Sequence, residues 1–305
     1  MLTFDRRPTW LRLLFSLRGS ALVRVRYRLL FVVVVSLIVT VIEEYFEYRF
    51  SVPVGIMSLL GVALGIFLGF RTSASYDRYW EGRKLWGRLV NESRSLARHT
   101  LVFLESARFE RRRELIYTQV AFVHALRMQL RDQFELDKLA PYLSKEALEA
   151  AGRSKNPANQ IVLDLSRALQ KEARPGGFSE YAFVEAMRFC RELTDIQGGC
   201  ERIKSTPIPH SYTMLIHQVV AMYVFILPFG VIDALHFLTP IAVFIIAYTF
   251  LGLDAVGDEI EDPFGEDDND LPLDAISRTI EMNLREMLGD ETVPEPLRPT
   301  RGVLT

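Results

Sequence analysis

Long apolar stretches alternate with strongly charged ones along this chain of 305 residues. Residues 51–70 carry no charged side chain, and residues 211–232 and 234–253 are interrupted by a single histidine each. A helix that crosses a bilayer needs roughly 20 predominantly apolar residues. Each of these three stretches therefore predicts a transmembrane helix.

A fourth apolar stretch, residues 29–42, is shorter and lies between Arg28 and Glu43. The long side chain of Arg28 can extend its charge to the membrane surface, so this stretch also predicts a span. The competing interpretation is a cleaved signal peptide. It fits less well, because the leader is long and no small-residue cleavage site follows Ile42.

Basic residues near the span ends indicate the orientation, because cytoplasmic loops are enriched in Lys and Arg. They precede the first span and follow the second, whereas the connection between these spans is mainly acidic. Two helical hairpins with both chain termini in the cytoplasm are therefore expected. The basic residues are Arg6, Arg7, Arg12, Arg18, Arg24, Arg26 and Arg28 before the first span, and Arg71, Arg78, Arg83, Lys84 and Arg88 after the second.

The segment between the two hairpins has the apolar spacing of amphipathic helices and no strand alternation. Asn156 followed by Pro157 predicts the start of a helix, and a further helix is expected from Ser179 to Ile203. Because no Gly, Pro or Asn lies between Arg71 and Gly82, the second span is expected to continue beyond the membrane.

The prediction is thus an all-α integral membrane protein with four transmembrane helices and a helical cytoplasmic domain. The expected segments are a cytoplasmic N-terminal segment at 1–28, the first two transmembrane helices at 29–70, a cytoplasmic helical region at 71–207, the last two transmembrane helices at 208–254, and a cytoplasmic acidic segment and tail at 255–305.

Composition and motif content mainly exclude other classes of protein. The formal net charge of −2 gives no general attraction to nucleic acid. Cys190 and Cys200 are too few for a disulfide framework and are interpreted as inert thiols in a reducing compartment. The five histidines lack metalloprotease spacing, and no nucleophile-elbow, Walker or dinucleotide-binding motif is present. The sequence therefore does not indicate an enzyme.

The second span carries two stripes of residues on neighbouring faces of the helix. Gly61, Gly65 and Gly69 recur every four residues and share a helix face that suits close helix packing. Val62, Ile66 and Phe70 repeat at the same interval, displaced by one residue. Around an axis formed by several copies, these apolar residues would make stacked rings that gate by dewetting. The alternative is ordinary helix packing inside one subunit.

The segment from Asp254 to Asp270 contains nine acidic residues and no basic one. Clustered oxygen ligands in a turn suit Ca²⁺, which takes six to eight of them. A solvated acidic face is the competing interpretation, because EF-hand spacing is absent.

Three motifs resemble the bestrophin family. The run LGIFLGFRTSASYDRYW resembles the second transmembrane helix of bestrophins, which lines the channel neck, although Ile66 replaces the usual phenylalanine and Tyr79 a common tryptophan. The segment DPFGEDDND resembles the NPFGEDDDD motif of the family, with Asp262 in place of Asn and Asn269 in place of Asp. The stretch TPIPHSYT resembles the family's IPLVYTQ.

The resemblance implies roles for particular residues. Val62, Ile66 and Phe70 would line the neck of a pentamer, and Ile208 would form a narrower cytosolic aperture. The alternative for Ile208 is a buried position in a plain interhelical turn. In animal bestrophins the acidic motif builds a calcium clasp. Here the corresponding candidate ligands are Asp267 and Asp270, flanked by Asp262 and Glu266.

The expected function is a passive channel for small inorganic ions in a bacterial inner membrane, formed by a homopentamer in contact with membrane lipid. Chloride selectivity follows by analogy with animal bestrophins, whereas the uncharged neck leaves Na⁺ selectivity open. No cofactor is required, Ca²⁺ is a candidate ligand, and no nucleic acid partner is expected. A membrane-bound metal-dependent enzyme that uses the acidic run and a membrane scaffold are the alternatives.

Overall fold

The computed structural model describes residues 1, 19–46, 52–104, 109–173, 177–300 and 302–305. The described residues are almost entirely helical, and their only β-type pairing is an isolated bridge between Thr300 and Val303. Most of the basic residues expected before the first span lie outside the described residues. The prediction of an all-α chain is confirmed.

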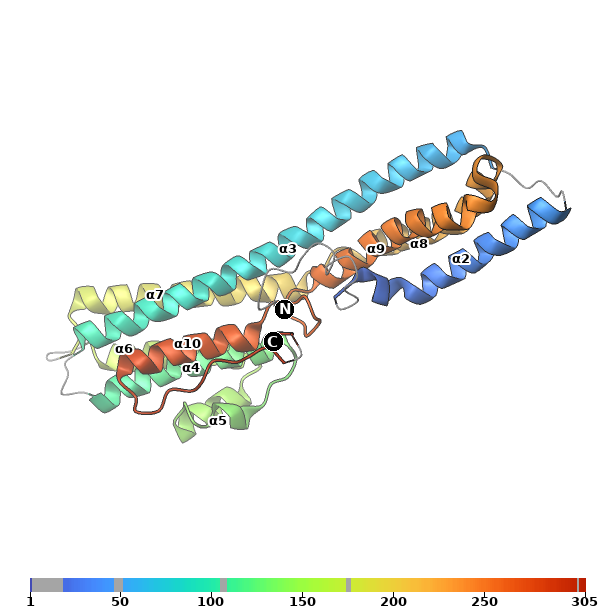
Figure 1. Ribbon diagram of the computed structural model, residues 1–305. Helices are drawn as coiled ribbons and strands as arrows, with labels where there is room; N and C mark the ends of the chain where they lie inside the picture. The colour runs from blue at the N-terminus through green and yellow to red at the C-terminus, as the bar shows by residue number, and fades with distance from the viewer. Residues whose placement is uncertain (2–18, 47–51, 105–108, 174–176, 301) are drawn as a thin grey trace. The chain divides into compact units, whose positions relative to one another are not determined.

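The chain divides into two compact units. The first, here called the membrane unit, comprises residues Phe4–Tyr79 and Pro207–Asp262. The second, here called the helical unit, comprises Met1–Thr3, Trp80–Thr206 and Pro263–Thr305. Helix α3 (Val54–Phe103) is continuous across the boundary in the sequence, which confirms that the second span runs on without a break (Figure 1).

The membrane unit contains α2 (Ala21–Phe46), the first part of α3, α8 (His210–Leu235) and α9 (Thr239–Glu261). By length and composition, Ala21–Phe46, Val54–Phe103 and His210–Glu261 are apolar enough to cross a membrane. The last of these stretches is two helices, because the 3₁₀ turn η3 (His236–Leu238) separates α8 from α9, as expected for a very short connection.

The first span is longer than expected from its apolar residues, because α2 begins at Ala21 rather than near Leu29. Its core side chains, Val25, Leu29 and Val32, pack in one cluster with residues of α3, α8 and α9. Figure 1 shows α2 running alongside α9. Van der Waals packing between the four helices therefore holds the membrane unit together.

The helical unit contains the later part of α3, α4 (Phe109–Leu130), η2 (Leu136–Leu139), α5 (Lys145–Arg153), α6 (Pro157–Lys171), α7 (Glu180–Ser205) and α10 (Leu273–Leu288). The predicted helix starts are confirmed. The Asn156 side chain accepts a hydrogen bond from the Asn159 amide at 3.1 Å, and Ser179 accepts one from Ala182 at 3.2 Å. Both side chains satisfy amide groups that the first helical turn leaves free.

Helix α10 was not predicted and lies in the segment interpreted as an acidic stretch and tail. Ile280 and Leu284 on one of its faces are completely buried, and α10 packs against α4. The helix ends at Gly289, whose φ of +83° is the left-handed conformation that favours glycine. Helix α10 is thus part of the core of the helical unit.

Candidate functional site

Helix α3 has two contrasting faces in the membrane unit. Leu64 and Leu68 are buried in the core. The expected neck residues lie on another face, where Val62 is 64% exposed, Ile66 54% and Phe70 66%. The described helices of the protomer therefore leave this stripe of three apolar side chains uncovered.

The glycine stripe is packed at only one of its three positions within the protomer. A β-carbon built on Gly61 would lie 2.6 Å from the hydroxyl oxygen of Tyr223 on α8. At Gly65 and Gly69, apart from the nearby backbone of α3 itself, no described atom lies within 4 Å of such a carbon. Gly61 thus allows α8 to approach α3, whereas Gly65 and Gly69 face open space in a single subunit.

A charged cluster begins at the residue after the apolar stripe. Arg71 is completely buried, and one of its guanidinium nitrogens donates to Asp254 Oδ1 at 2.6 Å. The other contacts Asp258 Oδ1 and lies 3.8 Å from Glu261 Oε2. Paired carboxylates compensate for the cost of burying the guanidinium charge. Arg71, which the sequence pattern suggested as a flanking basic residue, is a central residue of the membrane unit.

His217 of α8 extends this cluster. Its Nδ1 lies 2.7 Å from Asp254 Oδ2, and its Nε2 lies 3.5 Å from Asp258 Oδ1. His217, Asp254 and Asp258 each offer a ligand atom within 4.8 Å of the others. Within the described ranges, they are the only such group of three metal-capable side chains. The sequence signal was the i, i+4 spacing of Asp254 and Asp258, which places both carboxylates on one face of α9.

The expected calcium ligands belong to two different units. Asp262 ends the membrane unit, whereas Glu266, Asp267 and Asp270 belong to the helical unit. The Asp270 carboxylate accepts a hydrogen bond from the backbone amide of Asp267 at 2.7 Å. Glu266 lies 3.9 Å from the Arg131 guanidinium. In the part of the chain that the structure describes, these four expected ligands form no group of three clustered metal-capable side chains.

The expected aperture residue, Ile208, is half-buried and precedes α8 by two residues. Its backbone amide donates a hydrogen bond to Glu261 Oε1 at 3.1 Å. This bond ties the chain before α8 to the end of α9. Ile208 is therefore held by its backbone while its side chain keeps partial exposure.

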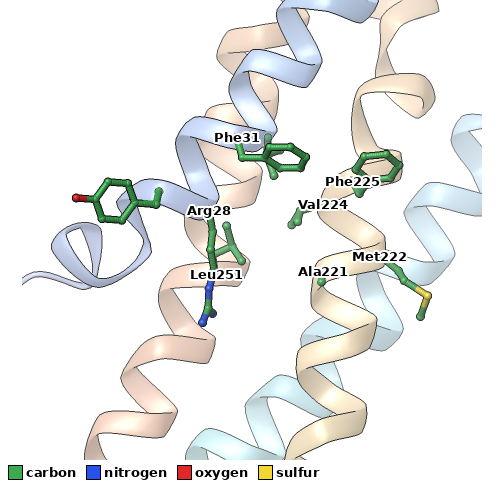
Figure 2. A pocket seen from close by; sticks show the side chains of 9 residues that line it. Arg28, Phe31, Ala221, Met222, Val224, Phe225 and Leu251 are labelled. Carbon is green, nitrogen blue, oxygen red and sulfur yellow. The ribbon is translucent and has the colours of Figure 1, made fainter.

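An apolar groove of about 700 Å³ opens on the membrane unit between α2, α8 and α9. Phe31 of α2 and Phe225 of α8 approach each other across it, and Arg28 lies at one end (Figure 2). Apart from this guanidinium the lining is almost wholly apolar. The groove thus combines a hydrocarbon-like wall with one cationic side chain. The remaining lining residues are Tyr27, Val32, Ala221, Met222, Val224 and Leu251.

Comparison with known proteins agrees with this architecture. Residues 2–286 match the family model described as Bacterial/Fungal Bestrophin protein. The chain is 40% identical over 293 residues to the voltage-dependent anion channel-forming protein YneE of Escherichia coli K12, covering 96% of each chain. It is 38% identical over 288 residues to a voltage-dependent anion channel-forming protein of Mesorhizobium japonicum, covering 93% of this chain and 91% of that one.

Solved structures give the same result. The crystal structure of a bacterial bestrophin homologue from Klebsiella pneumoniae superposes with a TM-score of 0.83 at 35% identity, covering 88% of this chain and 100% of that chain. One family thus accounts for the four-helix membrane unit, the long α3 and the motifs on it. The chain belongs to the bacterial and fungal bestrophin family.

Proposed function

We propose that this membrane protein is a passive channel for small inorganic ions, built from several copies around a central axis. The observation that carries this proposal is the uncovered stripe of Val62, Ile66 and Phe70 on α3. Family membership supports it, because relatives that match nearly the whole chain are named as channel-forming proteins. The same membership favours a channel over a membrane-bound enzyme or a scaffold.

In this proposal the stripe faces the axis and each residue contributes to one apolar ring. A narrow apolar ring excludes water at small radius and conducts only when it widens, so it is suited to gating. Ile208 would form a second, cytosolic constriction. The resemblance to bestrophins supports five copies, and the open space beside Gly65 and Gly69 suits contact with a neighbouring subunit.

Selectivity needs a separate test, because the three neck side chains carry no charge and cannot distinguish a cation from an anion. The names of the relatives support chloride, and Na⁺ is the alternative. The experiment is a bilayer recording of the purified oligomer across a NaCl gradient. A current that reverses near the chloride potential supports an anion channel, and reversal near the sodium potential means a cation channel.

The same recording can refute the channel itself. Light scattering of the sample first establishes that the oligomer is intact. The proposal would be overturned by an intact oligomer that carries no current in the NaCl gradient at any voltage that the bilayer withstands. A scaffold role would then become the better explanation.

For localisation, we infer the inner membrane of a bacterium with both termini in the cytoplasm. The support is the basic sequence at the start of α2 and after the apolar part of α3. A C-terminal alkaline phosphatase fusion should be inactive and a green fluorescent protein fusion fluorescent. The reverse pattern would place the C-terminus outside.

The groove beside Arg28 suits a membrane lipid. Its apolar walls fit an acyl chain, and a guanidinium at its end fits a phosphate headgroup (Figure 2). Native mass spectrometry of wild type and Arg28→Gln should show retained anionic phospholipid only in the wild type. Equal retention by both would argue against this site.

Passive permeation requires no cofactor, and Ca²⁺ on Asp262, Glu266, Asp267 and Asp270 remains a separate proposal. Its support is the acidic motif, while the Asp270 carboxylate already accepts a hydrogen bond within its own loop. Calcium titration of the purified protein, compared with Asp267→Asn, tests it. If calorimetric titration of the wild type with calcium gives no binding heat, the calcium proposal is refuted. The proposed channel function is unaffected by that result.

A further inference from the structure

The imidazole of His217 is placed between two carboxylates. Its Nδ1 lies 2.7 Å from Asp254 Oδ2, a normal hydrogen-bond distance. A neutral imidazole carries one N–H and one lone pair. If Nδ1 donates to Asp254, the lone pair is on Nε2, and this atom faces the carboxylate oxygen of Asp258. Two electron-rich atoms facing each other are stabilised by a cation between them, either a proton or a metal ion.

The separation of these two atoms suits a metal ion. Nε2 and Asp258 Oδ1 are 3.5 Å apart, which is long for a hydrogen bond. Nitrogen and oxygen ligands about 2.0–2.1 Å from a tetrahedral Zn²⁺ lie about 3.3 Å from each other. A bridging ion therefore fits this separation, and it would share Asp258 Oδ1 with the Arg71 guanidinium, which contacts the same oxygen.

Asp254 completes a known arrangement around metal-binding histidines. A ligating imidazole generally donates its other N–H to a carboxylate, which fixes the tautomer and the ring orientation. Asp254 is in this position, and Arg71 holds its second oxygen at 2.6 Å. Asp254 would thus orient His217, whereas His217 and Asp258 would contact the ion.

The charges of the cluster also favour a bound cation. The single positive charge of Arg71 faces three carboxylates, those of Asp254, Asp258 and Glu261. The carboxylates thus outnumber this guanidinium, at a partly buried position where uncompensated charge is costly. A divalent cation would balance them. In the single protomer the Asp258 and His217 side chains are 40% and 35% exposed.

We propose that His217 and Asp258 bind a divalent transition metal of the zinc class, with Asp254 as the positioning residue. A ring nitrogen with carboxylate oxygen suits Zn²⁺, whereas Ca²⁺ and Mg²⁺ prefer oxygen ligands alone. Because the cluster connects α8 and α9 to Arg71, next to Phe70, binding should also change conduction. Only this last consequence rests on the proposed channel function.

The test is calorimetric titration of the metal-stripped, purified oligomer with ZnCl₂ and, separately, CaCl₂. Wild type should bind zinc and show at least tenfold weaker binding of calcium. His217→Gln and Asp258→Asn should each lose at least tenfold in zinc affinity. The matched control is His236→Gln, which removes another histidine that pairs with a carboxylate, Glu44, at 2.8 Å. This variant should bind zinc like the wild type.

A second measurement uses the wild type alone, so it tests the proposal even if the variants fail to assemble. Cobalt(II) added to the wild-type oligomer should give visible absorption typical of nitrogen and oxygen coordination, and ZnCl₂ should abolish it. Zinc binding that is equal in wild type, His217→Gln and Asp258→Asn would overturn the proposal. So would a folded wild-type oligomer that binds neither zinc nor cobalt.

Conduction is read out separately. Micromolar ZnCl₂ should alter the current of wild type and His236→Gln, and leave His217→Gln unaffected. A protein that binds zinc at His217 but carries no current would keep the metal site and refute the channel. A zinc effect that persists in His217→Gln would refute control through this cluster.

Discussion

The phenol ring of Tyr223 on α8 fills the space beside Gly61 on α3. A β-carbon at Gly61 would stand 2.6 Å from the hydroxyl oxygen and 3.3 Å from ring carbon Cζ. Tyr223 also packs edge-on against Phe250, with ring centroids 5.1 Å apart, so its ring has little freedom to move. The sequence stripe of three glycines thus has one position where glycine is required by a partner within the same protomer.

We expect Gly61→Ala to lower the melting temperature of the purified oligomer. Forcing a methyl group into a packed core costs about 1–3 kcal/mol, which exceeds the roughly 1 kcal/mol that alanine gains over glycine in a helix. Tyr223→Phe should restore stability in the double variant, because it removes the hydroxyl oxygen. Gly55→Ala is the control, since no described atom lies within 4 Å of a β-carbon there. A Gly61→Ala protein as stable as the control would contradict the packing.

The neck assignment predicts that Ile66→Ala widens the channel and raises its single-channel conductance. The reason is that the substitution removes three carbon atoms per subunit from the ring that Ile66 forms, while leaving the core face of α3 untouched. Ile38→Ala on α2 is a matched control, because Ile38 is 52% exposed and Ile66 54%. Single-channel recording measures both. Equal conductance of Ile66→Ala and wild type, or an equal rise in Ile38→Ala, would count against the stripe as the neck.

Local patterns predicted the helices well because their causes lie within a few residues. The Asn156 cap, the Ser179 cap and the uninterrupted α3 each follow from side chains next to the feature they determine. The same information was present for α10, where Ile280, Leu284 and Leu288 recur every four residues. That helix was missed because the acidic run before it suggested a solvated tail.

The Arg71 cluster could not be predicted in the same way. A charge beside an apolar run indicates a membrane boundary, and nothing nearby in the sequence marks Arg71 as buried. Its partner Asp254 lies 183 residues away, and pairing them requires the packing of α3 against α9. His217 was recognised as an ionisable residue in a span, but its contacts with two carboxylates depend on that packing too.

Glu281 gives a prediction for the pH dependence of the helical unit. Its buried carboxylate accepts hydrogen bonds from Tyr142 at 2.8 Å and pairs with His124 Nε2 at 3.2 Å. Burial by itself would raise the pKa of Glu281, but these hydrogen bonds and the charges of His124 and Arg278 lower it to about 2. The folded protein therefore binds this proton less readily than the unfolded chain does.

It follows that Glu281 stabilises the fold above its ordinary pKa of 4.5, and that this stabilisation is lost as pH falls towards about 2. Thermal unfolding followed by circular dichroism between pH 2 and 7 measures the loss. Glu281→Gln should lower stability at pH 7 by about 3–5 kcal/mol and show a weaker pH dependence. Glu149→Gln, which removes an exposed pair with Arg153, should keep the wild-type dependence. Parallel pH curves for all three proteins would refute the role of Glu281.

The two cysteines are expected to be unreactive in the folded protein. Cys190 and Cys200 are free and buried on α7, and burial raises the pKa of Cys190 to about 11 and that of Cys200 to about 12. Maleimides react with the thiolate, which is scarce at neutral pH when the pKa is this high. Native protein should therefore remain unlabelled at pH 7.5, and both thiols should react in SDS. A cysteine at exposed Glu149 controls for reagent activity. Rapid labelling of the native wild type would mean that α7 opens. If the native wild type is not labelled, labelling of the variant Ile66→Cys would report whether the stripe is in contact with water.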